Sequence, residues 1–145
     1  SIKQIKNNSQ VHKLILNRRH LTQNPNEEGH AGLSVIITSQ KYNACDLITR
    51  VNMSDIILFK TENSKELNCI KEELMADLEK DIQDKVLKLA WKDKYSFLLI
   101  KNYLGTKDRY YVRFNKIIFE DTDDNGDIDE IKIEEKENDK TNLKK

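Results

Sequence analysis

The chain lacks long hydrophobic runs and has little cysteine. No apolar stretch approaches the roughly 18 residues that a membrane-spanning helix requires, so no membrane partner is expected. The N-terminal residues do not have the pattern of a signal peptide. The two cysteines, Cys45 and Cys69, lie far apart and belong to no CxxC or His/Cys pair. We therefore expect two buried, reduced thiols in a cytosolic protein, without a disulfide or a cysteine-bound metal.

Charge is abundant but unevenly distributed. The formal net charge of the 145 residues is zero, yet residues 120–145 carry a net charge of −6 and residues 1–119 a net charge of +6. The composition of residues 120–145 predicts a disordered acidic tail, and the remaining length suits about one domain. A basic body permits contact with a polyanion, although mild basicity is also common as a simple aid to solubility.

Hydrophobic periodicity predicts an α/β protein. Apolar residues at helical spacing predict helices at 3–18 and about 81–93, with a short helical turn at 45–50. Asn63 followed by Glu66 is typical of a helix N-terminus, which predicts one more helix. Strands are expected at 33–38, 55–60, 96–101 and around Tyr110, Val112 and Phe114, the last two forming a hairpin. Residues 22–31, which hold the only proline, are predicted to be a mobile loop.

The most informative of these strands ends at Gln40. Residues 33–37 form a nearly continuous apolar run, which is typical of a strand buried on both faces of a parallel sheet. Ligands of open parallel sheets lie beyond the carboxyl ends of the strands, so Gln40 stands where a ligand could be met. Two parallel strands, 33–38 and 55–60, make a poor sheet alone. We therefore expect a truncated domain or one that another chain completes.

Several segments, taken in order, resemble one family. They are Leu16–Leu21, Asn24–Glu28, Gly32–Asn43, Arg50–Asp55 and Leu58–Thr61. From about residue 3 to about residue 119 the chain resembles the genome-packaging ATPase of large nucleocytoplasmic DNA viruses, in the FtsK–HerA branch of P-loop NTPases. The resemblance implies that residues 1–119 are the C-terminal part of a RecA-like P-loop NTPase core. Such a core has parallel strands, flanking helices and a terminal hairpin, here followed by the acidic tail of residues 120–145.

The family's nucleotide-binding motifs are absent from the sequence. It contains no GxxxxGK[ST], and by the family's order it begins just after the Walker B strand. The loop that cradles phosphates and the acids that hold magnesium would belong to an N-terminal half. ATP and Mg²⁺ are therefore expected in the complete enzyme but not in this chain alone. The implied partners are double-stranded DNA, further copies in a ring, the N-terminal half of the ATPase domain and a capsid or portal component, in the host cytoplasm (viral factory) or the virion.

The resemblance also implies roles for four residues. Gln40 matches the polar sensor that bridges the γ-phosphate and the attacking water, or else it only caps a strand. Arg50 lies in the segment that faces a neighbouring subunit, as a trans arginine finger or as a salt-bridged surface residue. Arg18 and Arg19 match a family motif. They are interpreted as phosphate or intersubunit contacts, or as cations favoured at a helix C-terminus.

The sequence of the acidic tail matches part of the pattern of a calcium-binding loop. The ligand positions are Asp121, Asp123, Asn125 and Asp127. Position twelve of the loop is Lys132 instead of the bidentate glutamate of an EF-hand, and residues 117–119 look like a strand instead of an entering helix. A solvated acidic tail is the simpler interpretation, so no metal site is expected.

Two functions remain open. In the first, the chain is part of an ATP-driven DNA translocase that packages viral DNA into the capsid, to which it contributes the sensor and the finger. In the second, it is a non-catalytic remnant that acts as an interaction module for an ATPase partner or for nucleic acid. The missing P-loop favours the second function for this chain taken alone.

Overall fold

The computed structural model of the chain describes residues 9–18, 33–121 and 128–134. These residues divide between two compact units. The first comprises Ser1–Met53 with Asn63–Ile70, and the second comprises Ser54–Glu62 with Lys71–Lys145. Each unit is described by itself. No helix among the described residues is long and apolar enough to span a bilayer.

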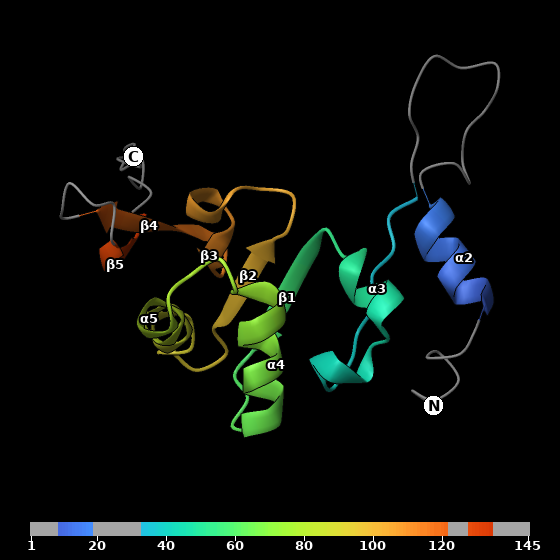
Figure 1. Ribbon diagram of the computed structural model, residues 1–145, viewed down its shortest axis with the longest axis horizontal. Coiled ribbons are helices and arrows are strands. Elements are labelled where there is room, and N and C mark those ends of the chain that lie inside the picture. Colours follow the sequence, from blue (N-terminus) through green and yellow to red (C-terminus); the bar gives the residue numbers. More distant parts are fainter. Residues whose placement is uncertain (1–8, 19–32, 122–127, 135–145) are drawn as a thin grey trace, which may run out of the picture. The chain divides into compact units, whose positions relative to one another are not determined.

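The first unit consists of short helices. They are α2 (Ser9–Asn17), a 3-10 helix (Tyr42–Ala44), α3 (Leu47–Val51) and the first turns of α4 (Ser64–Leu74). α2 packs against α3, and Ile15 is its buried residue (Figure 1). Asp46 caps α3 because its carboxylate accepts a hydrogen bond of 2.8 Å from the Thr49 N–H. The same carboxylate bonds to His12 Nε2 at 2.8 Å, which ties α2 to the start of α3.

The predicted start of α4 is confirmed. The Asn63 side-chain oxygen accepts hydrogen bonds from the N–H groups of Lys65 at 3.1 Å and Glu66 at 3.2 Å. These bonds satisfy two of the donors that a helix N-terminus leaves unpaired. The predicted turn at 45–50 and the second long helix are confirmed too, as α3 and as α5 (Lys80–Ala90).

The second unit is built on one five-stranded sheet. Its strands are β1 (Asp55–Phe59), β2 (Phe97–Lys101), β3 (Tyr110–Val112), β4 (Asn115–Asp121) and β5 (Ile128–Ile133). They lie in the order β1-β2-β3-β4-β5, and every neighbouring pair is antiparallel. The contacts of α5 with β2, β3 and β5 place this helix against the sheet (Figure 1).

The expected fold class is therefore wrong. The sheet is antiparallel throughout and is not the parallel sheet of a RecA-like core. Short connections join β2 to β3 and β3 to β4, and such connections produce antiparallel neighbours. β1 and β2 are also antiparallel, although α4 and α5 lie between them in the chain.

The core of the second unit lies on one face of the sheet. On β1 alternate residues point there, as the burial of Ile56 and Leu58 beside the exposed Ile57 and Phe59 shows. β2 differs, because Leu99, on the opposite face, is buried as well. The buried residues on the strands are Ile56, Leu58, Leu98, Leu99, Ile100, Tyr110, Val112, Ile117 and Phe119, and those on α5 are Ile82, Gln83, Val86, Leu87 and Ala90. Full burial of one such aliphatic or aromatic side chain stabilises the fold by roughly 1.5–3 kcal/mol.

Residues 33–38 do not form the predicted strand. No strand is assigned between residues 33 and 39, and none of the five strands of the sheet comes from this segment. Its apolar side chains are not buried on two faces, because Ile36 is 91% exposed and Leu33 is 38% exposed. The continuous apolar run was the basis for the parallel sheet, so both expectations fail together.

The acidic end of the chain contains a described strand. β5 pairs with β4 and lies within residues 120–145, the segment whose composition predicted disorder. Lys132 bonds to Glu120 on β4 at 2.7 Å, which places a cation among the acids of this pair. Residues 122–127 and 135–145 lie outside the described part of the chain.

Candidate functional site

The extended segment, residues 33–39, is held at both of its ends. At its start, the Leu33 N–H donates a hydrogen bond of 2.9 Å to the Arg18 carbonyl beyond the end of α2. At its end, the Ser39 hydroxyl donates to the Lys41 carbonyl at 2.8 Å and forms a local turn. Between these points the chain runs as a long trace without regular structure (Figure 1).

Glu66 fixes the chain immediately after this segment. Its Oε1 accepts hydrogen bonds from the N–H of Tyr42 and, at 3.3 Å, from the N–H of Asn43. The Glu66 residue is 5% exposed, and the Tyr42 ring beside it is also buried. Sequence reasoning gave Glu66 only a place in the first turn of a helix. Its role as a clamp has no signal in the sequence, because the two N–H groups lie more than twenty residues away.

The backbone and side chains of the extended segment are open to a partner. Val35 and Ile37 are half-buried, and Ile36 points an almost fully exposed side chain to solvent. Within the described residues no strand pairs with the segment. An apolar strand-length segment with free backbone groups is a ready template for pairing with another strand.

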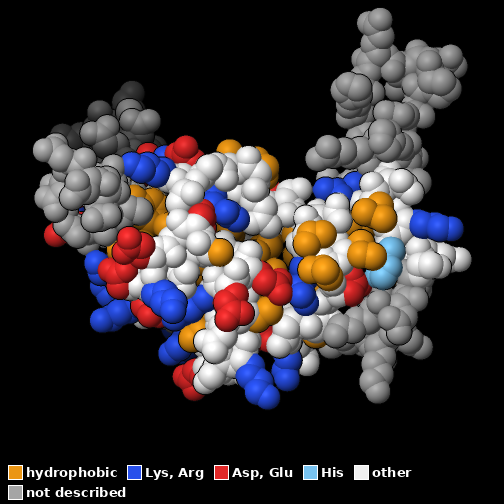
Figure 2. All heavy atoms as spheres, in the orientation of Figure 1, with side chains coloured by type: hydrophobic (Ala, Val, Ile, Leu, Met, Phe, Trp, Pro, Cys, Tyr) orange, Lys and Arg blue, Asp and Glu red, His pale blue; other side chains and the backbone are white. Residues whose placement is uncertain are grey.

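A second apolar surface lies on the helices of the first unit. Figure 2 shows hydrophobic side chains gathered on the face over α3 and α2. The exposed apolar residues of these helices are Leu16, Leu47, Ile48 and Val51. Exposed apolar side chains that cluster in this way commonly mark an interaction surface.

The predicted site residues do not converge on a nucleotide. Gln40 is exposed directly after the extended segment. Arg50 donates from Nη1 to the Cys45 carbonyl at 2.8 Å, and its guanidinium lies 5.4 Å from the centre of the Tyr42 ring. Arg18 donates to the carbonyls of Ile15 at 2.7 Å and Asn52 at 3.2 Å. These contacts hold segments of the first unit, and the bond from Arg18 to the Ile15 carbonyl is of the kind that a cation makes at a helix C-terminus.

Among the described residues, no set of side chains fits ATP with Mg²⁺. Arg18 and Arg50 donate to backbone carbonyls, and no group of three or more His, Cys, Asp or Glu side chains among the described residues could hold a metal ion. Arg19 lies outside the described residues, as do Asp123, Asn125 and Asp127 of the calcium-loop pattern. The elements on either side of that pattern are the strands β4 and β5, whereas an EF-hand has helices there. The expectation of a strand at residues 117–119 is thus confirmed.

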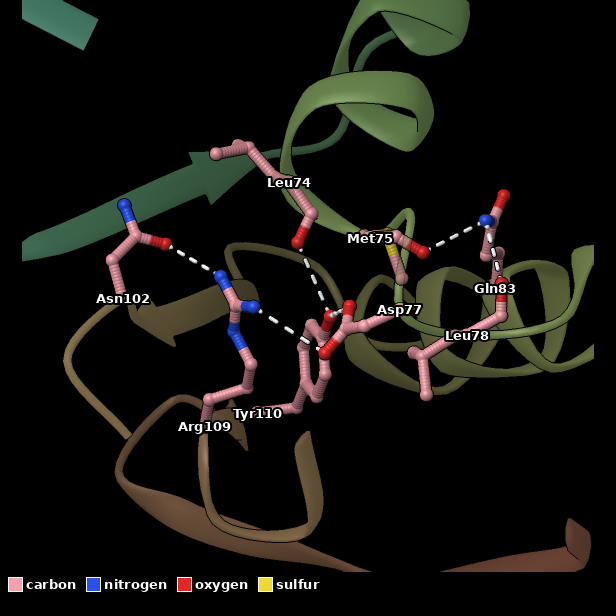
Figure 3. A network of polar contacts seen from close by, with 8 residues as sticks. All are labelled: Leu74, Met75, Asp77, Leu78, Gln83, Asn102, Arg109 and Tyr110. Atoms are coloured by element: carbon pink, nitrogen blue, oxygen red, sulfur yellow. Dashed lines mark hydrogen bonds and ion pairs between the residues drawn. The ribbon is translucent and has the colours of Figure 1, made fainter. Parts of the chain in front are cut away.

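A network of polar contacts around the buried Tyr110 braces the second unit (Figure 3). Tyr110 on β3 donates its hydroxyl to Asp77 at 2.6 Å and lies 3.1 Å from the Leu74 carbonyl. Arg109 bonds to Asp77 at 3.3 Å and to the Asn102 side chain at 2.7 Å. Burial raises the pKa of Tyr110, and the hydrogen bond to Asp77 and its charge raise it further, so the phenol stays protonated. These contacts join β3 to the segment between α4 and α5, so we interpret the network as structural.

The open face of the sheet carries aromatic residues and paired charges. Phe97 lies 5.7 Å from Phe59 and 5.5 Å from Phe114, ring centre to ring centre. Lys116 is paired with Asp108, and Lys132 is paired with Glu120. Both of these lysines therefore already have an acidic partner.

No protein-family model, curated protein or solved structure significantly matches this chain.

Proposed function

We propose that this chain is a non-catalytic interaction module of an ATP-driven DNA translocase. It acts by donating residues 33–39 as a strand to the sheet of another polypeptide. The observation that carries the proposal is the state of this segment, which is strand-length, apolar, held at both ends and unpaired within the described residues. Strand addition supplies affinity through main-chain hydrogen bonds, and side chains such as Ile36 supply specificity.

The translocase context comes from the sequence resemblance. In this proposal a P-loop polypeptide holds ATP and Mg²⁺, and the present chain supplies Gln40 at the end of the donated strand. The anchoring of Tyr42 and Asn43 by Glu66 supports this geometry, because it limits the freedom of the residues next to Gln40. Double-stranded DNA is then a ligand of the whole assembly.

ATP hydrolysis tests the proposal. The chain is assayed alone and together with a polypeptide from the same genome that carries a P-loop and Walker B acids. We expect no turnover above buffer by the chain alone, and an increase in the partner's turnover when the chain is added. Ile36→Lys should abolish the increase, because a charge on the donated strand opposes burial in a sheet.

The matched control places the same charge elsewhere. Asn43→Lys substitutes an exposed residue just beyond the segment and should leave the increase intact. Turnover by the isolated chain, or an increase that survives Ile36→Lys, contradicts the proposal. If the increase depends on Ile36 but survives Gln40→Ala, the module stands and the sensor role is wrong.

A further inference from the structure

The second unit has a free sheet edge. β1 is the first strand of the sheet, and within the described residues no strand lies on its outer side. Edge strands of soluble proteins are usually protected by charge, proline or a bulge. β1 has the sequence Asp-Ile-Ile-Leu-Phe, with one charge at its start and no proline.

The pairing with β2 shows which backbone groups are at that edge. The Asn102 N–H donates to the Ser54 carbonyl at 2.8 Å, and hydrogen-bonded pairs recur at every second residue of an antiparallel ladder. Ile56 and Leu58 therefore bond to β2, opposite Ile100 and Leu98. It follows that the N–H and C=O groups of Ile57 point away from β2, toward the free edge.

The extended segment matches this edge in chemistry. β1 is apolar on both faces, with Ile56 and Leu58 on the covered face and Ile57 and Phe59 on the open face. A strand added beside it needs apolar side chains on both faces as well, and residues 33–37 supply them in a nearly continuous run. The segment carries no charge, so no ionised group would be buried in the joint.

We propose that residues 33–39 of one copy add as a strand to the free edge of β1 in a second copy. This inference goes beyond the proposed function, because it gives the same segment a second acceptor, β1 of another copy, when the P-loop polypeptide is not bound. A second copy is the occupant that fits best, because one sequence contains both an unpaired donor and an unpaired acceptor of similar length. Every copy also carries one donor segment and one free β1 edge, so the two surfaces are present in equal numbers.

The proposed contact has a definite symmetry. Donor and acceptor are different surfaces, so the interface is heterologous and each copy uses one of each. Head-to-tail contacts of this type produce rings when the rotation closes and filaments when it does not.

Two proline variants separate the donor from the acceptor. Ile36→Pro removes an N–H from the middle of the donor segment. Ile57→Pro removes an N–H that faces the free edge, so the bonds between β1 and β2 are kept. The full-length chain and each variant are studied by sedimentation velocity over a wide range of concentration, after circular dichroism has shown that they are folded.

The expected result is specific to a head-to-tail contact. The unchanged chain should associate with rising concentration. Each single variant should bind with an affinity at least about tenfold lower than that of the unchanged chain. An equimolar mixture of the variants should form a dimer and nothing larger, because only one intact donor and one intact acceptor meet. Lys60→Pro, just beyond the end of β1, is the control and should associate as the unchanged chain does.

A disulfide experiment gives a second measurement that does not depend on proline. Chains with Ile36→Cys and chains with Ile57→Cys, both with Cys45→Ser and Cys69→Ser, are mixed and oxidised. A covalent heterodimer supports the proposal. A chain with both new cysteines that closes its disulfide internally, without dimer, overturns it.

The outcomes also distinguish this inference from the proposed function. If Ile36→Pro weakens association and Ile57→Pro does not, the donor segment acts on another acceptor, and only the inference fails. An unchanged chain that stays monomeric at all concentrations also overturns the inference, while the ATPase experiment with the P-loop polypeptide still decides the function. If that experiment and the sedimentation experiment are both insensitive to Ile36, both proposals fail.

Discussion

The hydroxyl of Tyr110 donates a hydrogen bond of 2.6 Å to the carboxylate of Asp77, which joins β3 to the segment between α4 and α5. Tyr110 has no exposed surface, and its oxygen also lies 3.1 Å from the Leu74 carbonyl. One buried phenol therefore links the sheet to the end of one helix and to the approach to the next. Arg109, the preceding residue, approaches the same carboxylate.

Tyr110→Phe should lower the free energy of unfolding by about 0.5–1.5 kcal/mol, because it removes the hydrogen bond that the buried hydroxyl donates to Asp77. Urea denaturation followed by circular dichroism measures the change. Tyr103→Phe is the control, since Tyr103 is an exposed tyrosine, and it should have almost no effect. Equal stability of the two variants would show that the network does not brace the unit.

Gln83→Met should also be destabilising. The Gln83 amide nitrogen donates to the carbonyls of Met75 at 2.8 Å and Leu78 at 2.9 Å, which closes the turn between α4 and α5. Methionine keeps the volume but removes both of these buried hydrogen bonds, at a cost of about 1–3 kcal/mol in thermal or urea unfolding. Lys88→Met, at an exposed position of α5, tests for a general effect of the apolar side chain and should change stability little.

Asp46→Asn should reduce the acid sensitivity of the first unit. Burial raises the pKa of the Asp46 carboxyl, but the hydrogen bonds from Thr49 and His12 and the charge of His12 lower it by more, below its ordinary value of 3.8. A carboxylate with a depressed pKa stabilises the folded state above its unfolded pKa and loses this contribution as the pH falls through the folded pKa.

The measurement is the melting temperature as a function of pH. Below pH 3.8 the unchanged chain should lose stability more steeply than Asp46→Asn, which keeps the N-cap oxygen but cannot titrate. Asp93→Asn removes an exposed carboxylate as a control and should keep the steep dependence. Parallel curves for the unchanged chain and Asp46→Asn would refute this assignment.

Arg50→Ala should act on stability. The guanidinium donates to the Cys45 carbonyl at 2.8 Å and lies over Tyr42, so its loss should lower the free energy of unfolding by about 1–3 kcal/mol. Lys41→Ala, which removes an exposed cation nearby, is the control. The alternative role as a trans finger predicts a folded, stable variant that poisons neighbouring sites when mixed with unchanged subunits. Unaltered stability together with such poisoning would favour the finger.

The helices could be predicted from the sequence because their signals are local. Asn63 and Glu66 marked the start of α4, and the apolar spacing in residues 81–93 marked α5. The hairpin of residues 96–101 with the strand around Tyr110 was predicted and is confirmed as β2 and β3. The direction of β1 was not predicted, because a continuous apolar run reveals neither the partner strand nor which face is covered. Ile57 and Phe59 belong to such a run and are nevertheless exposed. The same ambiguity affected residues 33–38, whose apolar side chains were interpreted as buried.

β5 also had a signal in the sequence, which the acidic composition of the segment obscured. The alternation of Ile131 and Ile133 with Glu130 and Lys132 is the period of a strand, and it lies in a segment whose acidity predicted disorder. Of the candidate site, the position of Gln40 after an apolar segment was readable, whereas the carbonyl partners of Arg18 and Arg50 were not. Those partners depend on how the helices of the first unit pack, which no local pattern encodes.

The indole of Trp91 donates to the Leu58 carbonyl of β1 at 3.1 Å, and it is the only tryptophan in the chain. Tryptophan fluorescence therefore reports on the second unit alone, while the helical signal in circular dichroism also includes the contributions of α2 and α3. A denaturation followed by both signals asks whether the molecule melts as one cooperative body or as two. Coincident curves mean one thermodynamic unit, and separated curves give each half its own midpoint.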